Sequence, residues 1–161
     1  LYMRMDVRCK TTAADLIEKL SDSELADILY EYGDIKKSYM LAKILKKELP
    51  RTTFELRDLV KKQSDVAPVF QALRIAVNDE MGELERTLAV VPQLLQVGGK
   101  CICVTFHSLE DRIVKLKFQE GANPCTCPKS FPVCVCGKVP TVKVITKKVV
   151  TACAKEVAQR L

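Results

Sequence analysis

The chain has 161 residues, of which 48% are hydrophobic, and 26 lysines and arginines against 20 acidic residues give it a formal net charge of +6. That much apolar material supports the packed core of one ordinary domain, or of one domain with an insert, and excludes an intrinsically disordered chain. No apolar run approaches the ~20 residues of a membrane span and no secretory leader is recognisable, so we expect a cytoplasmic protein whose basic excess favours a polyanionic partner, nucleic acid first.

Residues 11–63 have the pattern of four short amphipathic helices joined by short loops. The second helix ends at Gly33, a residue suited to a helix stop, and the third ends before Pro50. Three of the helices open on a capping-box pattern, in which Ser or Thr is followed three residues later by an acidic residue: Thr12 with Asp15, Ser21 with Glu24, and Thr52 with Glu55. Together they predict a compact all-helical subdomain.

A longer helix is predicted next, because apolar residues recur at steps of three and four from Phe70 to Val91. Pro92 should kink or end this helix. The stretch 100–106, KCICVTF, is short, apolar and β-branched, which predicts a buried strand of a mainly parallel sheet. Residues 108–119 return to a helical pattern, and residues 138–148 alternate like a second strand.

Helix, strand, helix, loop and strand in this order are part of a doubly wound α/β domain, with too few strands for a whole sheet. We therefore expect a piece of a longer protein, as the start at Leu1 also suggests, or a chain that borrows strands from a partner such as a second copy in a homodimer. The predicted organisation is a linker at 1–10, a helical insert at 11–67, the carboxyl-terminal part of the α/β domain at 68–150, and a tail at 151–161.

Eight cysteines are many for this length, and four of them crowd into a loop at 124–137. In a reducing cytosol, clustered thiols indicate metal or redox chemistry before structural disulfides. Four thiolates can hold one structural Zn²⁺ tetrahedrally, and the candidate ligands are Cys125, Cys127, Cys134 and Cys136. Their C-x-C spacing differs from the commoner C-x2-C, so reduced or locally disulfide-bonded cysteines are the open alternative.

The only histidine of the chain lies in an abrupt strand-to-helix turn, CVTFHSLEDRIVK. Ligands of open α/β sheets bind beyond the carboxyl ends of strands and beside the amino ends of the following helices, which is where His107 and Ser108 fall. Ser108 with Asp111 has capping-box spacing, and Glu110 and Asp111 complement the helix dipole. A structural cap explains these three residues but gives no role to His107 or Arg112.

The stretch FHSLEDRIVK closely resembles a signature of the bacterial 16S ribosomal RNA cytosine-N4-methyltransferases, which are AdoMet-dependent enzymes. Further stretches resemble the same family in the same order along nearly the whole chain: MRMD, TAADLIEKLSDSELADILYEYGD, FQALRIAVNDEMGELERTL, GGK and CTCPKSFPVCVCGKVP. Two departures are Tyr2, where the family usually has Asp, and the missing His-Pro-Ala-Thr-Arg-like stretch before FQALR.

The resemblance implies a Rossmann-like class I methyltransferase domain interrupted by a helical insert. It also implies methyl transfer from AdoMet to the N4 amine of a cytidine in 16S ribosomal RNA, with this RNA or the small ribosomal subunit as the partner. The family's glycine-rich AdoMet loop lies upstream of MRMD, and these residues contain no GxGxG-like run. We therefore expect no cofactor-binding residue in this chain and no methylation by this chain alone.

An N4-methyltransferase must hold the target base out of its stack, orient an amine of negligible basicity and accept its proton. By resemblance, His107 orients the substrate or accepts the proton, with Ser108 as its hydrogen-bond partner. Arg112 contacts an RNA phosphate, or locks the turn by pairing with Asp111 or Glu110. Five of the expected substrate contacts lie outside the Ser108–Arg112 stretch and three lie within it. The whole expected set is Arg4, Asp6, Gln71, Arg74, Asn78, Glu110, Asp111 and Arg112.

Each of these residues can instead have a purely structural role. Arg4 and Asp6 can form a local ion pair, and the polar stripe of Gln71, Arg74 and Asn78 can be an ordinary solvated helix flank. Two other interpretations of the chain also stay open. One is a non-catalytic RNA-binding module that keeps the helical insert, and the other is a zinc-stapled interaction domain without a nucleic-acid role.

Overall fold

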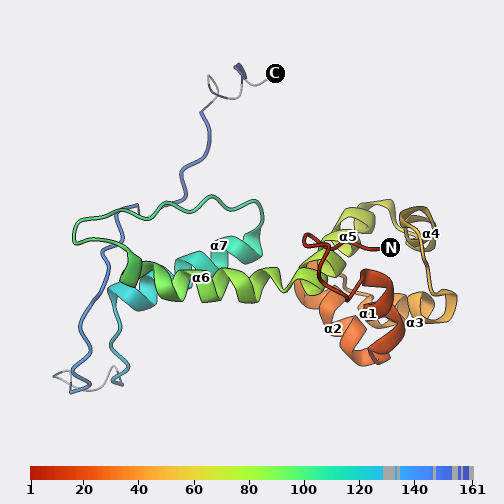
Figure 1. Cartoon of the computed structure of the whole chain (residues 1–161), viewed down its shortest axis with the longest axis horizontal. Helices are drawn as coiled ribbons and strands as arrows, with labels where there is room; N and C mark the ends of the chain where they lie inside the picture. Colours follow the sequence, from red (N-terminus) through yellow and green to blue (C-terminus); the bar gives the residue numbers. More distant parts are fainter. Residues whose placement is uncertain (129–132, 134, 147, 154–155, 157, 160–161) are drawn as a thin grey trace. The chain divides into compact units, whose positions relative to one another are not determined.

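The computed structural model describes residues 1–128, 133, 135–146, 148–153, 156 and 158–159. The chain divides into two compact units, Leu1–Leu84 and Glu85–Leu161. The helices, in chain order, are α1 (Ala13–Lys19), α2 (Asp22–Gly33), α3 (Ser38–Glu48), α4 (Thr53–Leu59), α5 (Gln63–Asn78), α6 (Glu80–Leu94) and α7 (Ser108–Ala122) (Figure 1). The division between the units falls inside α6.

The first unit is a set of short helices around one hydrophobic core, with α3 and α5 as the main neighbours of α2. The four helices predicted between residues 11 and 63 all form. The buried core also takes in the middle of α5, beyond the predicted insert. Its members are Ala13, Ile17, Leu25, Ala26, Leu29, Ile35, Ala42, Leu45, Leu56, Val60, Val69, Ala72 and Leu73. The insert boundary at residue 67 stays a prediction.

The three capping boxes predicted from the sequence are confirmed. In the first, the backbone N–H of Asp15 donates to Thr12 Oγ1 at 3.1 Å, and the backbone N–H of Thr12 donates to Asp15 Oδ2 at 2.8 Å. The hydrogen bond from the Thr12 hydroxyl is the largest cause that lowers the pKa of Asp15 below its ordinary value. These caps satisfy backbone donors that a helix otherwise leaves without partners at its amino end.

Gly33 is the last residue of α2, so the helix ends where predicted, but the left-handed residue that follows is Asp34 (φ 51°) and not Gly33. Its lack of a side chain serves the packing of α2 against α5 instead. A Cβ at this position would lie 2.9 Å from the carbonyl oxygen of Pro68, which is backbone and cannot swing away. Beside this close approach, Gln71 Nε2 donates a hydrogen bond of 3.1 Å to the Tyr32 carbonyl.

The prediction of one long helix from Phe70 to Val91 is wrong. Asp79 takes the left-handed conformation (φ 48°) and ends α5, and α6 begins at the next residue. An ion pair spans the break, since the guanidinium of Arg74 donates to both carboxylate oxygens of Glu80 at 2.8 and 3.0 Å. A single left-handed residue leaves the three-and-four spacing of apolar residues almost intact. The break between α5 and α6 therefore cannot be recognised from that spacing.

In the described residues neither predicted strand forms, at 100–106 or at 138–148, and the α/β class is therefore not confirmed. Backbone ladder bonds need a neighbouring strand, and the described chain supplies none to either segment. In the first segment, exposed and half-buried residues still alternate as in a strand. Ile102, Val104 and Phe106 are 87%, 77% and 89% exposed, whereas the residues between them are half-buried. Its apolar face thus has no cover within the described second unit.

None of the described helices is both long and apolar enough to cross a membrane.

Candidate functional site

The turn that carries the histidine is closed by its own side chains. His107 is the N-cap of α7, in an extended conformation (φ −147°, ψ 164°), and its Nδ1 accepts a hydrogen bond from the backbone N–H of Glu110 at 3.4 Å. In return, Glu110 Oε2 accepts from the backbone N–H of Phe106 at 2.7 Å. Two side chains three residues apart therefore hold the start of the helix.

The predicted capping pair of Ser108 and Asp111 is wrong by one residue, because Ser108 is already the first residue of α7. Nδ1 of histidine stands at the same place along the side chain as Oδ1 of asparagine, so a neutral imidazole can cap a helix as asparagine does. The signal in the sequence was present: a glutamate three residues after the histidine repeats the capping-box spacing.

This cap assigns the proton of the imidazole. Because Nδ1 accepts a hydrogen bond, the neutral ring carries its proton on Nε2. Nε2 is buried and has no hydrogen-bond partner in the described residues, and the nearest carboxylate oxygen, Glu110 Oε1, lies 3.5 Å away. The side chains of His107 and Glu110 are 13% and 23% exposed. The turn thus offers one N–H donor and one carboxylate acceptor side by side.

The neighbouring polar residues of α7 take little part in this arrangement. Ser108 and Arg112 are exposed, and Asp111 is half-buried. In the described structure the side chain of Arg112 forms no ion pair with Asp111 or Glu110, so the alternative in which it locks the turn is not realised. Its guanidinium remains on the surface of α7, where an anionic group can reach it.

The amino-terminal MRMD segment is held by α5. Asn78 Oδ1 accepts from the backbone N–H of Met5 at 2.8 Å, and Asn78 Nδ2 donates to the carbonyl of Met3 at 2.9 Å. Asp6 pairs with Arg8 at 2.8 Å rather than with Arg4, and the hydrogen bonds from Arg8 lower its pKa. The Arg4 guanidinium stacks on Tyr2, 5.2 Å from the ring centroid.

The polar stripe predicted as a substrate contact is used by the fold. Gln71 bonds to α2, Arg74 bonds to Glu80, and Asn78 bonds to the MRMD segment, as described above. Because all three side chains bond within the chain, they are neither a simple solvated helix flank nor side chains left free for RNA. Their roles toward a substrate stay predictions.

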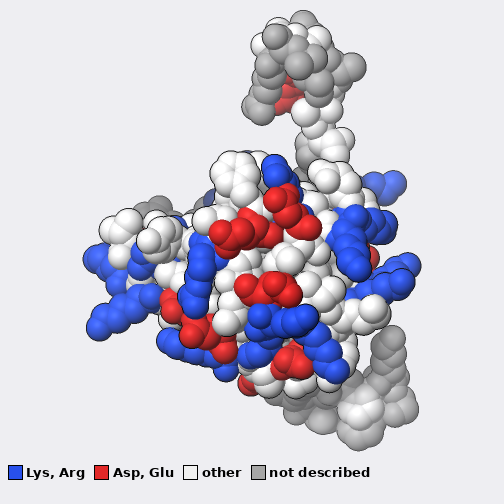
Figure 2. Space-filling model, turned by 90° about the vertical axis from the view of Figure 1, so that its right-hand side faces the viewer, with Lys and Arg blue, Asp and Glu red and all other residues white. Residues whose placement is uncertain are grey.

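Basic side chains do not gather into a field of one sign on the face that Figure 2 shows. There, Lys and Arg side chains are interspersed with Asp and Glu. Part of the excess is used internally, since Lys46 Nζ donates to the carbonyls of Glu18 and Leu20 at the end of α1, and Arg51 pairs with Glu18 at 3.0 Å. The net charge of +6 therefore overstates what one surface presents.

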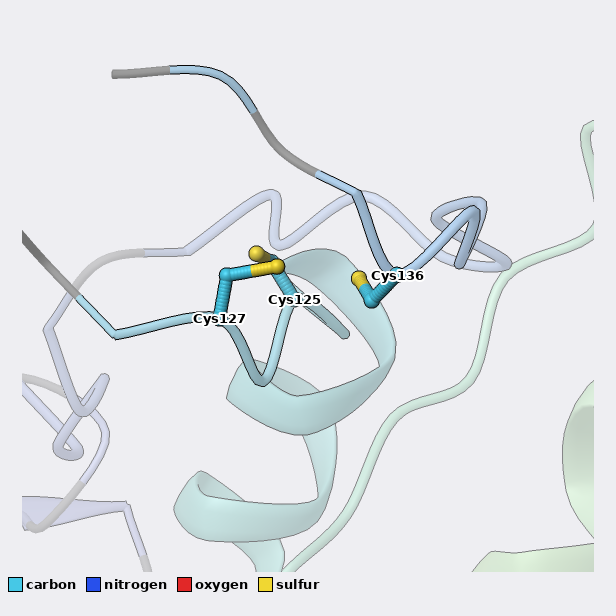
Figure 3. Close-up of side chains that lie close together, drawn as sticks. All are labelled: Cys125, Cys127 and Cys136. Atoms are coloured by element: carbon cyan, nitrogen blue, oxygen red, sulfur yellow. The ribbon is translucent and has the colours of Figure 1, made fainter. Parts of the chain in front are cut away.

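Five of the described cysteines form two groups, and the exposed Cys9 and Cys153 belong to neither. The Sγ atoms of Cys125, Cys127 and Cys136 all lie within 4.8 Å of one another (Figure 3), and the fourth predicted ligand, Cys134, lies outside the described residues. In the second group the Sγ atoms of Cys101 and Cys103 are 3.9 Å apart. Burial, reinforced by the contact with Cys101, raises the pKa of the Cys103 thiol to about 11, which keeps it protonated and unreactive at neutral pH.

A family model and individual relatives both relate the chain to methyltransferases. The model of the MraW methylase family matches residues 1–160. Over 98% of its length the chain is 45% identical to "Ribosomal RNA small subunit methyltransferase H" of Geotalea uraniireducens, 44% identical to the protein of the same name of Geobacter sp. (strain M21), and 41% identical to that of Carboxydothermus hydrogenoformans. In each case the match covers 55% of the relative, so the chain spans about half the length of these relatives.

Proposed function

The chain belongs to the MraW methylase family, and on that premise we propose that it carries the substrate side of an enzyme that methylates the N4 amine of a cytidine in 16S ribosomal RNA. The names of the relatives support a methyltransferase acting on small-subunit ribosomal RNA. The choice of the N4 amine rests on the FHSLEDRIVK resemblance and on the donor and acceptor that the His107 turn presents. We place the activity in the cytoplasm, where ribosomal subunits are substrates.

The residues of this chain do not fit a complete AdoMet site. AdoMet needs a carboxylate for its ribose hydroxyls and a glycine-rich backbone close to its methionine part. One hollow of the described surface is lined by Gln119, Ala122, Asn123, Pro140, Val142, Lys143 and Val144, and another by Leu116, Gln119, Glu120 and Asn123. Neither lining contains a glycine. We therefore assign no AdoMet contact to this chain and propose that it does not methylate RNA on its own.

On the substrate side, His107 orients the base and Glu110 accepts the proton. Nε2–H of His107, which is buried in this structure, would be uncovered in the complete enzyme and donate to an acceptor of cytosine, its N3 or O2, and so fix the plane of a flipped base. Glu110 Oε1, which is not the oxygen bonded to Phe106, accepts a hydrogen bond from the N4 amine and takes its proton as the methyl group is transferred. This assignment replaces the proton-accepting role considered for His107, since accepting a proton at Nδ1 would break the helix cap.

Exposed groups supply the wider RNA contact. Arg112 lies one turn along the same helix and suits a phosphate. In the helical unit, Lys43 stacks on Tyr39 at 4.7 Å and Arg57 stacks on Phe54 at 5.4 Å, and both rings are more than half exposed. Such cation–aromatic pairs are suited to unpaired bases and their phosphates. A homodimer is not needed for these contacts and stays a separate prediction.

The test is a chimera in which the part of the Geotalea uraniireducens relative outside the match is joined before Leu1. The chimera is incubated with AdoMet and small ribosomal subunits from cells that lack this modification, and the ribosomal RNA is digested to nucleosides for mass spectrometry. We expect N4-methylcytidine from the chimera and none from the 161-residue chain. Methylation of another base, or at carbon 5 of cytidine, would contradict the proposal.

Two variants of the chimera test the turn. His107→Asn keeps the helix cap through Oδ1 but removes the Nε2–H donor, and Glu110→Gln removes the proton acceptor. Both should lower turnover, by roughly 10²-fold if they act in proton handling and orientation, while the helical circular dichroism stays unchanged. Unchanged turnover in His107→Asn would leave the histidine a purely structural cap. If the chimera binds RNA but never methylates it, the non-catalytic interpretation is favoured.

A further inference from the structure

The three cysteines of the first group come from the two ends of one loop. Cys125 and Cys127 follow closely on the carboxyl end of α7, and Cys136 lies on the stretch that returns toward that helix (Figure 3). Their Sγ atoms all lie within 4.8 Å of one another. Cys127 and Cys136 are half-buried, and Cys125 is exposed. Thiols that are far apart along a loop therefore converge on one point near the helix end.

The backbone of the loop is closed independently of the thiols. The backbone N–H groups of Thr141 and Val142 both donate to the carbonyl of Gly121, in the last turn of α7, at 3.0 and 3.5 Å. The absence of a side chain at Gly121 allows this return, since a Cβ there would lie 2.8 Å from Cγ2 of Val142. The chain thus leaves α7, makes an excursion and is fastened to the same turn of the helix. These two bonds close the loop that carries the three cysteines.

From this geometry we propose that Cys125, Cys127 and Cys136 bind one structural Zn²⁺ that fastens the loop to the end of α7. In a tetrahedral zinc site with Zn–S bonds of ~2.3 Å, neighbouring sulfurs are about 3.8 Å apart, so the sulfurs need to draw together by no more than about 1 Å. Soft thiolates select zinc over the hard cations Mg²⁺ and Ca²⁺. The fourth ligand predicted from the sequence is Cys134, and this assignment stays a prediction.

The bound metal would stabilise the loop in the way that a hydrophobic core stabilises a larger segment. The cysteine loop belongs to the second unit, whose described buried hydrophobic residues are Leu88 and Val114. Ile102, Val104 and Phe106 of the same unit are exposed. A thiolate-bound zinc supplies folding free energy locally, without apolar burial. The inference does not rest on the proposed methylation, because it concerns only the order of this loop and is measured without activity.

The experiment uses the whole 161-residue chain, purified under reducing conditions without chelator, and measures zinc by atomic emission. We expect about one zinc per chain, lost in Cys125→Ser and in Cys136→Ser. The matched controls are Cys9→Ser and Cys153→Ser, which change exposed cysteines outside the cluster and should keep the metal. Loss of zinc from the controls to the same degree, or no zinc in the unchanged chain, would overturn the proposal.

A second measurement keeps the proposal testable if the serine variants fold poorly. Co²⁺ added to the chelator-treated, unchanged chain should give the intense thiolate-to-cobalt absorption of a tetrahedral sulfur site, and one equivalent of Zn²⁺ should abolish it. Protease cleavage inside residues 124–137 should be slow with zinc and fast after chelation. Absence of the cobalt absorption, an iron–sulfur spectrum, or a disulfide within the cluster in its place would each refute a zinc site.

Discussion

Asn78 provides the sharpest test of how the first unit is held together. Its amide accepts from Met5 N at 2.8 Å and donates to the carbonyls of Met3 at 2.9 Å and of Arg74 at 2.8 Å. Of these three bonds, two connect α5 to a segment more than seventy residues earlier. A neutral hydrogen bond contributes about 1 kcal/mol net, and Met5 is exposed enough for water to replace its partner. We therefore expect Asn78→Leu to lower the free energy of unfolding by about 1–3 kcal/mol.

Asn78→Asp separates the two halves of the amide. It keeps an acceptor for Met5 but turns the donor into a carboxylate oxygen that faces the Met3 carbonyl. At neutral pH this variant should lose at least as much as Asn78→Leu, and it should recover part of the loss in acid, when the protonated carboxyl can donate again. The control is Gln63→Leu, an exposed residue at the start of α5.

The assay is guanidinium unfolding followed by helical circular dichroism, combined with trypsin cleavage after Arg4 and Arg8. Release of the MRMD segment from α5 should speed this cleavage in both Asn78 variants. If Asn78→Leu unfolds within about 0.5 kcal/mol of the unchanged chain, as ordinary surface substitutions do, and trypsin cleavage is unaltered, the two long-range bonds do not hold the segment.

Further predictions concern the helix ends and the α2–α5 contact. Thr12→Ala should cost about 1 kcal/mol in a denaturant titration and Thr11→Ala, one residue outside the cap, almost nothing. Because the pKa of Asp15 is lowered in the folded chain, first by the Thr12 hydroxyl, its contribution to stability is present at neutral pH and is lost as the pH falls below its ordinary value of 3.8; the deficit of Thr12→Ala should shrink in the same range. Gly33→Ala should cost about 1–3 kcal/mol in thermal unfolding, since its Cβ meets the Pro68 carbonyl, and a neutral result would show that α2 and α5 are not in close contact.

What the sequence predicted well is local. The capping boxes at Thr12, Ser21 and Thr52 each combine a hydroxyl with an acidic residue at the right spacing, and their geometry needs nothing from the rest of the chain. Two predictions were wrong: the left-handed stop of α2 is Asp34 and not Gly33, and the helix does not continue unbroken through Asp79. Gly33 lies close to the Pro68 carbonyl, and Arg74 pairs with Glu80 across the break after Asn78. The helix-stop and apolar-spacing patterns used for these two predictions encode neither contact.

The two predicted strands do not form in the described residues, for a different reason. The alternation at Ile102, Val104 and Phe106 records a face suited to burial, but a strand exists only with a neighbour to bond to. In the candidate site, the functional role predicted from FHSLEDR stays a prediction. The helix cap was placed on Ser108 instead of His107 because hydroxyls are commoner caps than imidazoles. The convergence of Cys125, Cys127 and Cys136 was expected from their crowding, and the fastening of the loop to Gly121 was not.

The central claim is that this chain carries the substrate side of a methyltransferase and not its cofactor side. Calorimetric titration of AdoMet into the 161-residue chain, and in parallel into the chimera with the Geotalea uraniireducens relative, tests it most directly. We predict no heat beyond dilution with the chain and saturable binding of one AdoMet with the chimera. Saturable binding to the chain alone would contradict the claim, because it would require a cofactor site among residues that contain no glycine-rich loop.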